Sequence, residues 1–174
     1  NLDGSESKTP TRGAGVDARW LVIKGNAGFF GVTKRIHNGL YGGPGDGGAL
    51  GPDERRHYEA VQRKNAEGLL DVLTSDAIVL LHDPQTAGMT PALRSAGRLV
   101  LWRCHVGLDE PNKWSERAWA FLRPYLADVD GYVFSRAAFA PPWADPAQTF
   151  VVPPSIDPFS AKNEPVSDRN VRLA

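Results

Sequence analysis

AIVLLHDPQTAGMTPALRSAGRLVLWRCH, residues 77–105, is the stretch from which the rest of the chain can be interpreted. It holds two short apolar runs, Ala77–Leu81 and Leu99–Trp102, separated by a segment of helical length, Gln85–Ala96, and by Gly97. Fully buried parallel strands read as unbroken apolar runs rather than as alternating ones. The stretch therefore predicts a strand, a helix and a second strand parallel to the first.

Polar residues follow each apolar run at once. His82 and Asp83 follow the first run, and Arg103 and His105 follow the second. In parallel sheets the ligand crevice lies beyond the carboxyl ends of the strands, so side chains placed there by two neighbouring strands converge. We therefore expect these four residues to form the functional site.

The composition is that of an ordinary globular domain. Hydrophobic residues make up 41% and charged residues 23% of the 174 residues, which favours neither a disordered nor a fibrous chain. Twenty basic and twenty acidic side chains cancel, so the charge signature of a nucleic-acid-binding protein is missing. One cysteine cannot form an internal disulfide, and no apolar run approaches the length of a membrane span. A cytoplasmic protein is expected.

The two flanks lack apolar periodicity. Residues 1–18 are polar and rich in Gly, Ser, Thr and Pro, and we expect a disordered or irregular segment. Residues 157–174 are expected to form a linker towards a further domain. Residues 19–156 then form one domain.

The order of the elements in that domain predicts its architecture. Periodicity predicts a first strand over Arg19–Gly25, helices over Phe29–Leu40, Asp53–Leu73 and Pro111–Val129, and strands over Gly131–Ser135 and Phe150–Val152. With the unit at 77–105, this order is typical of an α/β protein with an open, mostly parallel sheet, flanking helices and right-handed crossovers.

Two features before that unit invite a functional interpretation and are expected to be structural. The glycine-rich run Gly42–Pro52 has no strand before it and no Gly-Lys-Ser/Thr after it, so a flexible surface connection is expected rather than a phosphate-binding loop. Asn65 falls on an apolar helical stripe, where capping of a neighbouring backbone group is expected rather than ligand contact.

Asp83 and Arg103 each have more than one possible role at this stage. The carboxylate of Asp83 can bind the hydroxyls of a polyol or act as a base, or it can cap a helix that starts near Gln85. The guanidinium of Arg103 can pair with Asp83 or hold an anionic oxygen.

Other groups at the same rim carry weaker signals. His82 and His105 lack the short-spaced ligand cluster of a zinc site, so no bound metal is expected. Lys24 ends the predicted first strand and can face solvent or substrate. Cys104 should point away from both of its neighbours, which predicts a buried, inert thiol. No nucleophile elbow, P-loop or dinucleotide fingerprint occurs.

Six motifs then occur in a characteristic order: RWLVIKG (19–25), FFGVTKRIHNGL (29–40), LLHDPQTAGM (80–89), LWRCHVGLDEPN (101–112), YVFS (132–135) and VVPPSIDPFSAKN (151–163). Together they cover almost all of Val16–Asn163. In these motifs the chain resembles the amino-terminal half of trehalose synthases, retaining glycosyltransferases of the two-domain GT-B fold that join a nucleotide-activated glucose to free glucose.

The resemblance implies a Rossmann-like acceptor domain that faces a second domain holding the nucleotide-glucose donor. By motif position, Asp83 is similar to the carboxylate that holds acceptor hydroxyls, and His105 to the residue that reaches the transferred sugar, so these two are the catalytic candidates. His82, Gln85, Arg103 and Lys24 would bind substrate at the rim. Such enzymes need no protein nucleophile, because the donor's phosphate assists attack on its own face.

The resemblance also bears on cofactors and partners. It implies glucose and nucleotide-glucose as partners and no resident cofactor; Mg²⁺ could assist activity, but this chain is not expected to bind it. A homodimer is possible. The strand and glycine-rich loop that open the family are not recognisable in residues 1–18, and the donor domain is absent after residue 174, so the chain alone is expected to be inactive.

Two alternatives stay open. A trehalose phosphorylase of the same fold would use phosphate or glucose 1-phosphate instead of a nucleotide donor. The chain could also act without turnover, as a carbohydrate-binding or interaction module.

Overall fold

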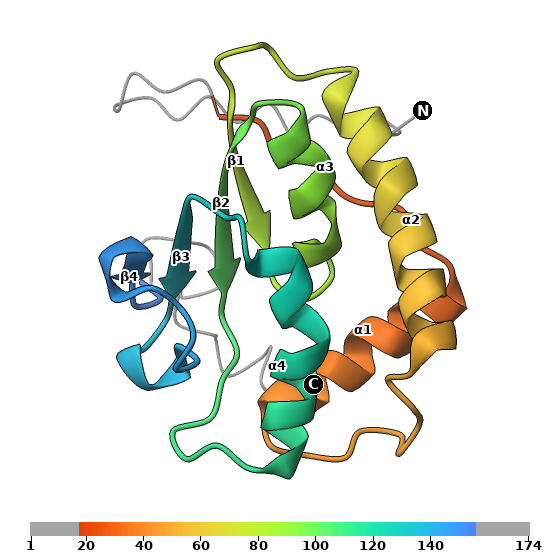
Figure 1. Ribbon diagram of the computed structural model, residues 1–174, viewed down its shortest axis with the longest axis vertical. Helices are drawn as coiled ribbons and strands as arrows, with labels where there is room; N and C mark the ends of the chain where they lie inside the picture. Colours follow the sequence, from red (N-terminus) through yellow and green to blue (C-terminus); the bar gives the residue numbers. More distant parts are fainter. Residues whose placement is uncertain (1–17, 156–174) are drawn as a thin grey trace, which may run out of the picture.

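The strand–helix–strand unit forms as predicted in the computed structural model of the chain, which describes residues 18–155 (Figure 1). Strand β1 (Ile78–His82) pairs in parallel with β2 (Leu99–Cys104). The helix between them is shorter than predicted, because a 3₁₀ turn at Ala87–Met89 precedes α3 (Thr90–Ser95). The other described helices and strands are α1 (Ala27–Leu40), α2 (Pro52–Leu70), α4 (Lys113–Leu126), β3 (Gly131–Phe134) and β4 (Thr149–Val151).

The sheet has the order β1-β2-β3-β4, and every neighbouring pair is parallel. Right-handed crossovers that add each strand beside the last place the connecting helices on one face. Figure 1 shows α1 to α4 gathered on one side of the strands, with β4 at the far edge. This confirms the predicted α/β, Rossmann-like class with a parallel sheet and flanking helices.

The two faces of the sheet differ in burial. Alternate residues of β1 and β2 face the helices, and Leu81 and Trp102 among them are 3% and 0% exposed. The residues between them face the other way, and Ile78, Leu80 and Leu99 are 65%, 45% and 43% exposed. Within residues 18–155, helices cover only one face; the other is called the open face below.

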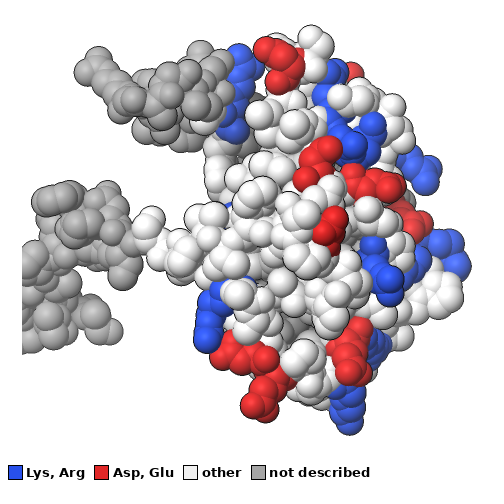
Figure 2. Space-filling view, turned by 60° about the vertical axis from the view of Figure 1, so that its left-hand side comes forward, with Lys and Arg blue, Asp and Glu red and all other residues white. Residues whose placement is uncertain are grey.

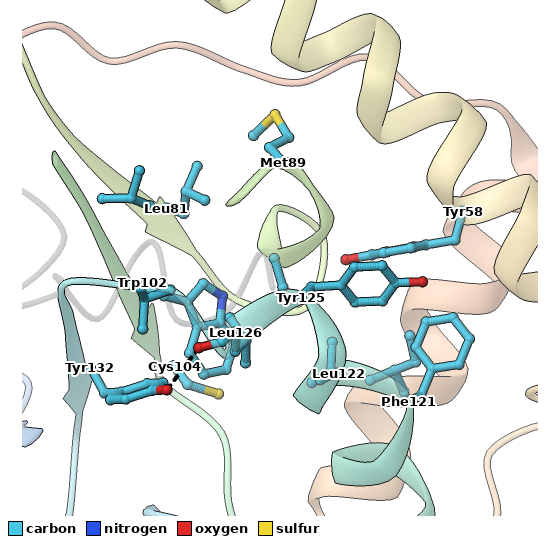
Figure 3. Close-up of a cluster of buried hydrophobic side chains, with 14 of the residues drawn as sticks. Tyr58, Leu81, Met89, Trp102, Cys104, Phe121, Leu122, Tyr125, Leu126 and Tyr132 are labelled. Atoms are coloured by element: carbon cyan, nitrogen blue, oxygen red, sulfur yellow. Dashed lines mark hydrogen bonds between the residues drawn. The ribbon is translucent and has the colours of Figure 1, made fainter. Parts of the chain in front are cut away.

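The core fills the layer between the sheet and the helices (Figure 3). Tyr58 of α2 is fully buried, and its ring centroid lies 5.4 Å from those of Phe121 and Tyr125 of α4. The hydroxyl of Tyr132 on β3 donates to the backbone oxygen of Leu126 at 2.7 Å. Packing and satisfied polar groups therefore fix α4 against both the sheet and α2.

The helices begin where the sequence offers caps. The Asn26 side chain accepts from the Phe29 N–H at the start of α1, and Asn112 does the same for Trp114 and Ser115 at the start of α4. These two helices approach closely at Gly39, where an added Cβ would lie 3.0 Å from the Cβ of Ala118.

The predicted first strand, Arg19–Gly25, is wrong. The segment is irregular, and Trp20 and Val22 are 61% and 65% exposed. A strand needs a neighbouring strand for its backbone, whereas the N–H and C=O groups of Lys24 both bond to the side chain of Asn65 on α2 at 2.8 Å. Asn65 thus caps a neighbouring backbone segment, as predicted.

The glycine-rich run is a surface connection, as predicted, but it is more restrained than a flexible one. The guanidinium of Arg35 binds both carboxylate oxygens of Asp46, at 2.6 and 2.9 Å. Arg117 of α4 donates to the backbone oxygen of Gly48 at 2.9 Å. The predicted segment 1–18, apart from Ala18, and the predicted linker 157–174 lie outside the described residues.

Candidate functional site

The structure brings together the four residues that the sequence placed at the strand ends. β1 and β2 run in register with His82 opposite Arg103, so both strands stop at the same edge. Alternation along the strands puts His82, Arg103 and His105 on the open face. The site therefore lies at the carboxyl edge of the sheet, on the side that the described helices leave uncovered.

Asp83 and His105 contact each other directly. The backbone N–H of His105 donates to Oδ1 of Asp83 at 2.9 Å, and the ring Nδ1 lies 3.2 Å from both carboxylate oxygens. The Asp83 side chain is 28% exposed and that of His105 40%. Both groups are thus held in place and remain accessible to a ligand.

An unusual backbone conformation aims Asp83 at His105. Its φ is 60°, and among the described residues it is the one non-glycine residue with a positive φ. Its N–H donates to the oxygen of Arg103 at 2.7 Å, and its oxygen accepts from the Trp102 indole N–H at 3.1 Å. A left-handed residue other than glycine costs about 1–2 kcal/mol, which β2 offsets here through these bonds.

The helix-capping alternative for Asp83 is wrong. The 3₁₀ turn and α3 start after Thr86 and Met89, and neither start uses the Asp83 carboxylate. That carboxylate points to β2 instead of to the chain that follows it.

Arg103 binds His105 rather than Asp83. Its Nε donates to Nε2 of His105 at 2.9 Å, and its Nη2 donates to the backbone oxygen of Val152, just beyond β4, at 3.3 Å. Of the two roles considered for Arg103, pairing with Asp83 is therefore not found. The guanidinium instead links the ends of β2 and β4.

The ring of His82 stacks on a face of the His105 imidazole. The rings of His82 and His105 are nearly parallel, at 17°, with centroids 5.5 Å apart, and the Trp20 ring lies 5.3 Å from that of His82. Burial lowers the pKa of His82, and the neighbouring His105 lowers it further. The ring is consequently neutral at neutral pH.

Gln85 and Lys24 are positioned by α2. The backbone oxygen of Gln85 accepts from Nε2 of Gln62 at 2.6 Å, while its side-chain Oε1 is buried and unpaired among residues 18–155. The backbone of Lys24 is bound by Asn65. Substrate binding by these two residues stays a prediction.

Sequence reasoning missed three residues that support the cluster: Trp20, Trp102 and Thr86, whose hydroxyl donates to the backbone oxygen of His82 at 2.7 Å. Trp20 and Trp102 look like apolar strand residues. For Trp102 the available signal was that a tryptophan N–H in a buried run usually needs an acceptor.

Cys104 lies on the opposite side of β2 from its two neighbours, as predicted. It is fully buried, and its thiol contacts the backbone oxygen of Val106 at 3.2 Å. Burial raises the pKa of this thiol well above its usual range. Cys104 is therefore not available as a nucleophile in the folded chain.

The described part of the chain shows few other candidate features. No three His, Cys, Asp or Glu side chains there are grouped to hold a metal, and no helix there is long and apolar enough to cross a membrane. A hollow of about 280 Å³ lies away from the cluster, between α4 and residues 138–143. Figure 2 shows acidic and basic side chains interspersed on one side of the molecule.

The cluster suits a ligand rich in hydroxyl groups. An ionised carboxylate offers about four acceptor positions, and His105 occupies only part of them. The guanidinium of Arg103 lies at the same edge and can bind an anionic oxygen of a ligand.

Comparison with known proteins gives a family match over most of the chain. The family model described as "Trehalose synthase, N-terminal domain" matches residues 7–141. The chain is 36% identical over 160 residues to a trehalose synthase of Thermococcus litoralis, covering 92% of the chain and 37% of that relative. It is 38% identical over 152 residues to one of Pyrococcus horikoshii (87% and 35%) and 34% identical over 158 residues to one of Rubrobacter xylanophilus (90% and 36%). The chain thus spans little more than a third of the length of these curated relatives.

Proposed function

Because the chain belongs to the family of trehalose synthase N-terminal domains, we propose that it is the acceptor-binding half of a retaining GT-B glucosyltransferase. The enzyme would form trehalose from a nucleotide-activated glucose and glucose. The contact between Asp83 and His105 carries the proposal, because it joins an accessible carboxylate and an imidazole at the edge where parallel sheets bind ligands.

Asp83 would hold the acceptor. Its Oδ1 accepts the His105 N–H, which fixes the carboxylate and leaves other lone pairs for the hydroxyls of glucose. His105 would reach the transferred sugar beside it. Arg103 and His82 border this pair directly, and Gln85 and Lys24 would approach it from the segments bound to α2.

The reaction would need no nucleophile from this chain. The acceptor hydroxyl attacks the anomeric carbon of the donor on the face of the leaving diphosphate, while the bond from that carbon to the diphosphate oxygen breaks. The hydroxyl proton passes to a phosphate oxygen of the leaving group. The burial of Cys104 agrees with this scheme.

The proposal has three further parts. A second domain would hold the nucleotide donor, the enzyme would lie in the cytoplasm, and it would form a homodimer.

A chimera tests the proposal. The matching segment of the Pyrococcus horikoshii trehalose synthase is replaced by this chain, and the product is incubated with glucose and each common nucleotide-glucose. We expect a non-reducing disaccharide from the chimera and much less from the same chimera with Asp83→Asn. A chimera that unfolds cooperatively but forms no such disaccharide with any donor would contradict the proposal.

Two further arms separate the alternatives. Turnover with glucose 1-phosphate, but with no nucleotide donor, would favour a trehalose phosphorylase. Isothermal titration of the 174-residue chain with glucose and trehalose tests a binding module. We expect weak or no binding, because one wall of a two-domain cleft buries too little of a sugar.

A further inference from the structure

Both ring nitrogens of His105 are engaged by neighbouring side chains. Nε2 receives the N–H of Arg103 at 2.9 Å, and Nδ1 lies 3.2 Å from each carboxylate oxygen of Asp83. Arg103 and Asp83 differ in the hydrogen bonds that they can make. A guanidinium only donates hydrogen bonds, and an ionised carboxylate only accepts them.

The two contacts select the same form of the ring. Nε2 has to carry a lone pair to accept from Arg103, and Nδ1 has to carry the proton to donate to Asp83. His105 in this arrangement is a neutral imidazole with its proton on Nδ1. Histidine in water favours the opposite form, with the proton on Nε2, so the preference has to come from the site.

Arg103 makes the shorter of the two contacts, at 2.9 Å against 3.2 Å. Its guanidinium is fixed at a second point by the backbone oxygen of Val152, so it does not depend on His105 for its place. The ring itself cannot swing towards solvent freely, because His82 stacks on one of its faces at a centroid distance of 5.5 Å. Arg103, Asp83 and His82 thus each contact the ring of His105.

We propose that Arg103 is a positioning residue that holds His105 in the Nδ1-protonated tautomer. The proposal about the tautomer stands without the proposed function. Its chemical consequence rests on that function: Nε2 then offers a lone pair only. A sugar hydroxyl can donate to Nε2 by displacing Arg103, whereas a phosphate oxygen has no donor there and would bind the guanidinium instead.

Nitrogen NMR of ring-labelled histidine tests this directly. The chain has four histidines, and His105→Gln identifies the His105 signals. At alkaline pH we expect Nδ1 of His105 in the protonated range and Nε2 in the unprotonated range, widely split. Arg103→Met should move both nitrogens towards averaged values, and Arg103→Lys, which keeps a cationic donor, should restore part of the splitting.

Arg136→Met provides a matched control. It removes one arginine charge near the same edge, from an exposed pair with Asp109 that does not involve His105. We expect the wild-type splitting to persist in this variant. A proton on Nε2 in the wild type, or an unchanged splitting in folded Arg103→Met, would overturn the proposal. Because no donor or acceptor sugar is present, a failure to make trehalose would not affect this result.

Discussion

The carboxylate of Asp83 and the imidazole of His105 meet across the ends of two adjacent parallel strands, with the His105 backbone N–H 2.9 Å from Oδ1. The contact depends on the left-handed backbone of Asp83, whose φ is 60°. Aspartate, asparagine and glycine tolerate this conformation better than other residues. The backbone and the carboxylate can therefore be tested separately by substitution.

We expect Asp83→Asn to change the free energy of unfolding by less than about 1 kcal/mol, because asparagine tolerates the backbone and its oxygen can still accept the His105 N–H. Asp83→Ala should cost about 1–2 kcal/mol more than Asp83→Gly, because only alanine bears the strain of the positive φ. Urea unfolding of the three variants measures this. Equal stability of the alanine and glycine variants would show that the turn relaxes in solution.

If the proposed function holds, Asp83→Asn in the chimera should lower kcat/KM for glucose by about ten- to a hundredfold, because a hydrogen bond to a charged group contributes about 1.5–3 kcal/mol. The KM for the donor should change much less. Initial rates at varied glucose and varied donor separate the two effects. A variant that loses stability without a kinetic defect for glucose would favour a purely structural role.

His82 should make stability depend on pH. Its pKa in the folded chain lies below the ordinary value of 6.5, chiefly because of burial. The unfolded state then takes up the proton first, so the stability from neutral His82 is present above about pH 6.5 and is lost as pH falls through the folded pKa. His82→Phe keeps a ring against His105 but cannot titrate. We expect the wild type to lose more stability than this variant between about pH 7 and pH 5; parallel urea midpoints would contradict the assignment.

Much of the fold could be predicted from residues 77–105. Unbroken apolar runs at Ala77–Leu81 and Leu99–Trp102 predicted parallel strands, and the rule for ligand crevices then brought Asp83 and His105 together. The full burial that such runs suggest is wrong on one face, where Ile78, Leu80 and Leu99 are exposed. The same reasoning failed at Arg19–Gly25, where an equally apolar run lies irregular and exposed. A short apolar run does not show whether a neighbouring strand exists to pair with it.

The details of the site were less accessible to sequence reasoning. Whether Asp83 capped a helix or faced β2 depended on one backbone dihedral angle, which the residue type permits but does not dictate. The partner of Arg103 depended on strand alternation, which puts residues 103 and 105 on the same face and brings the guanidinium against His105. Contacts between residues two apart on a strand can be predicted from the sequence once the boundaries of the strand are known.

Cys104 should be protected from thiol reagents in the folded chain. Its side chain is fully buried and its pKa is raised, so both access and thiolate formation are disfavoured. Because the chain has one cysteine, the labelling rate reports on this residue alone. We expect labelling only as fast as unfolding in the wild type, and a second, rapid phase after Ser75→Cys, which adds an exposed thiol. Rapid labelling of the wild type would contradict the burial.

Leu80 and Leu81 are neighbours on β1 with opposite surroundings, 45% and 3% exposed, and they test the open face of the sheet. Leu81→Ala should cost about 2–5 kcal/mol, because it leaves a cavity in the core between the sheet and the helices. Leu80→Ala should cost less than about 1 kcal/mol, because much of its surface already contacts water. Urea unfolding of both variants measures the difference, with Ile78→Ala as a second substitution on the open face.

Equal costs at both positions would mean that the open face is buried in solution, since parallel sheets are usually covered on both sides. Stability of the wild type that rises with protein concentration would then identify another copy of the chain as the cover.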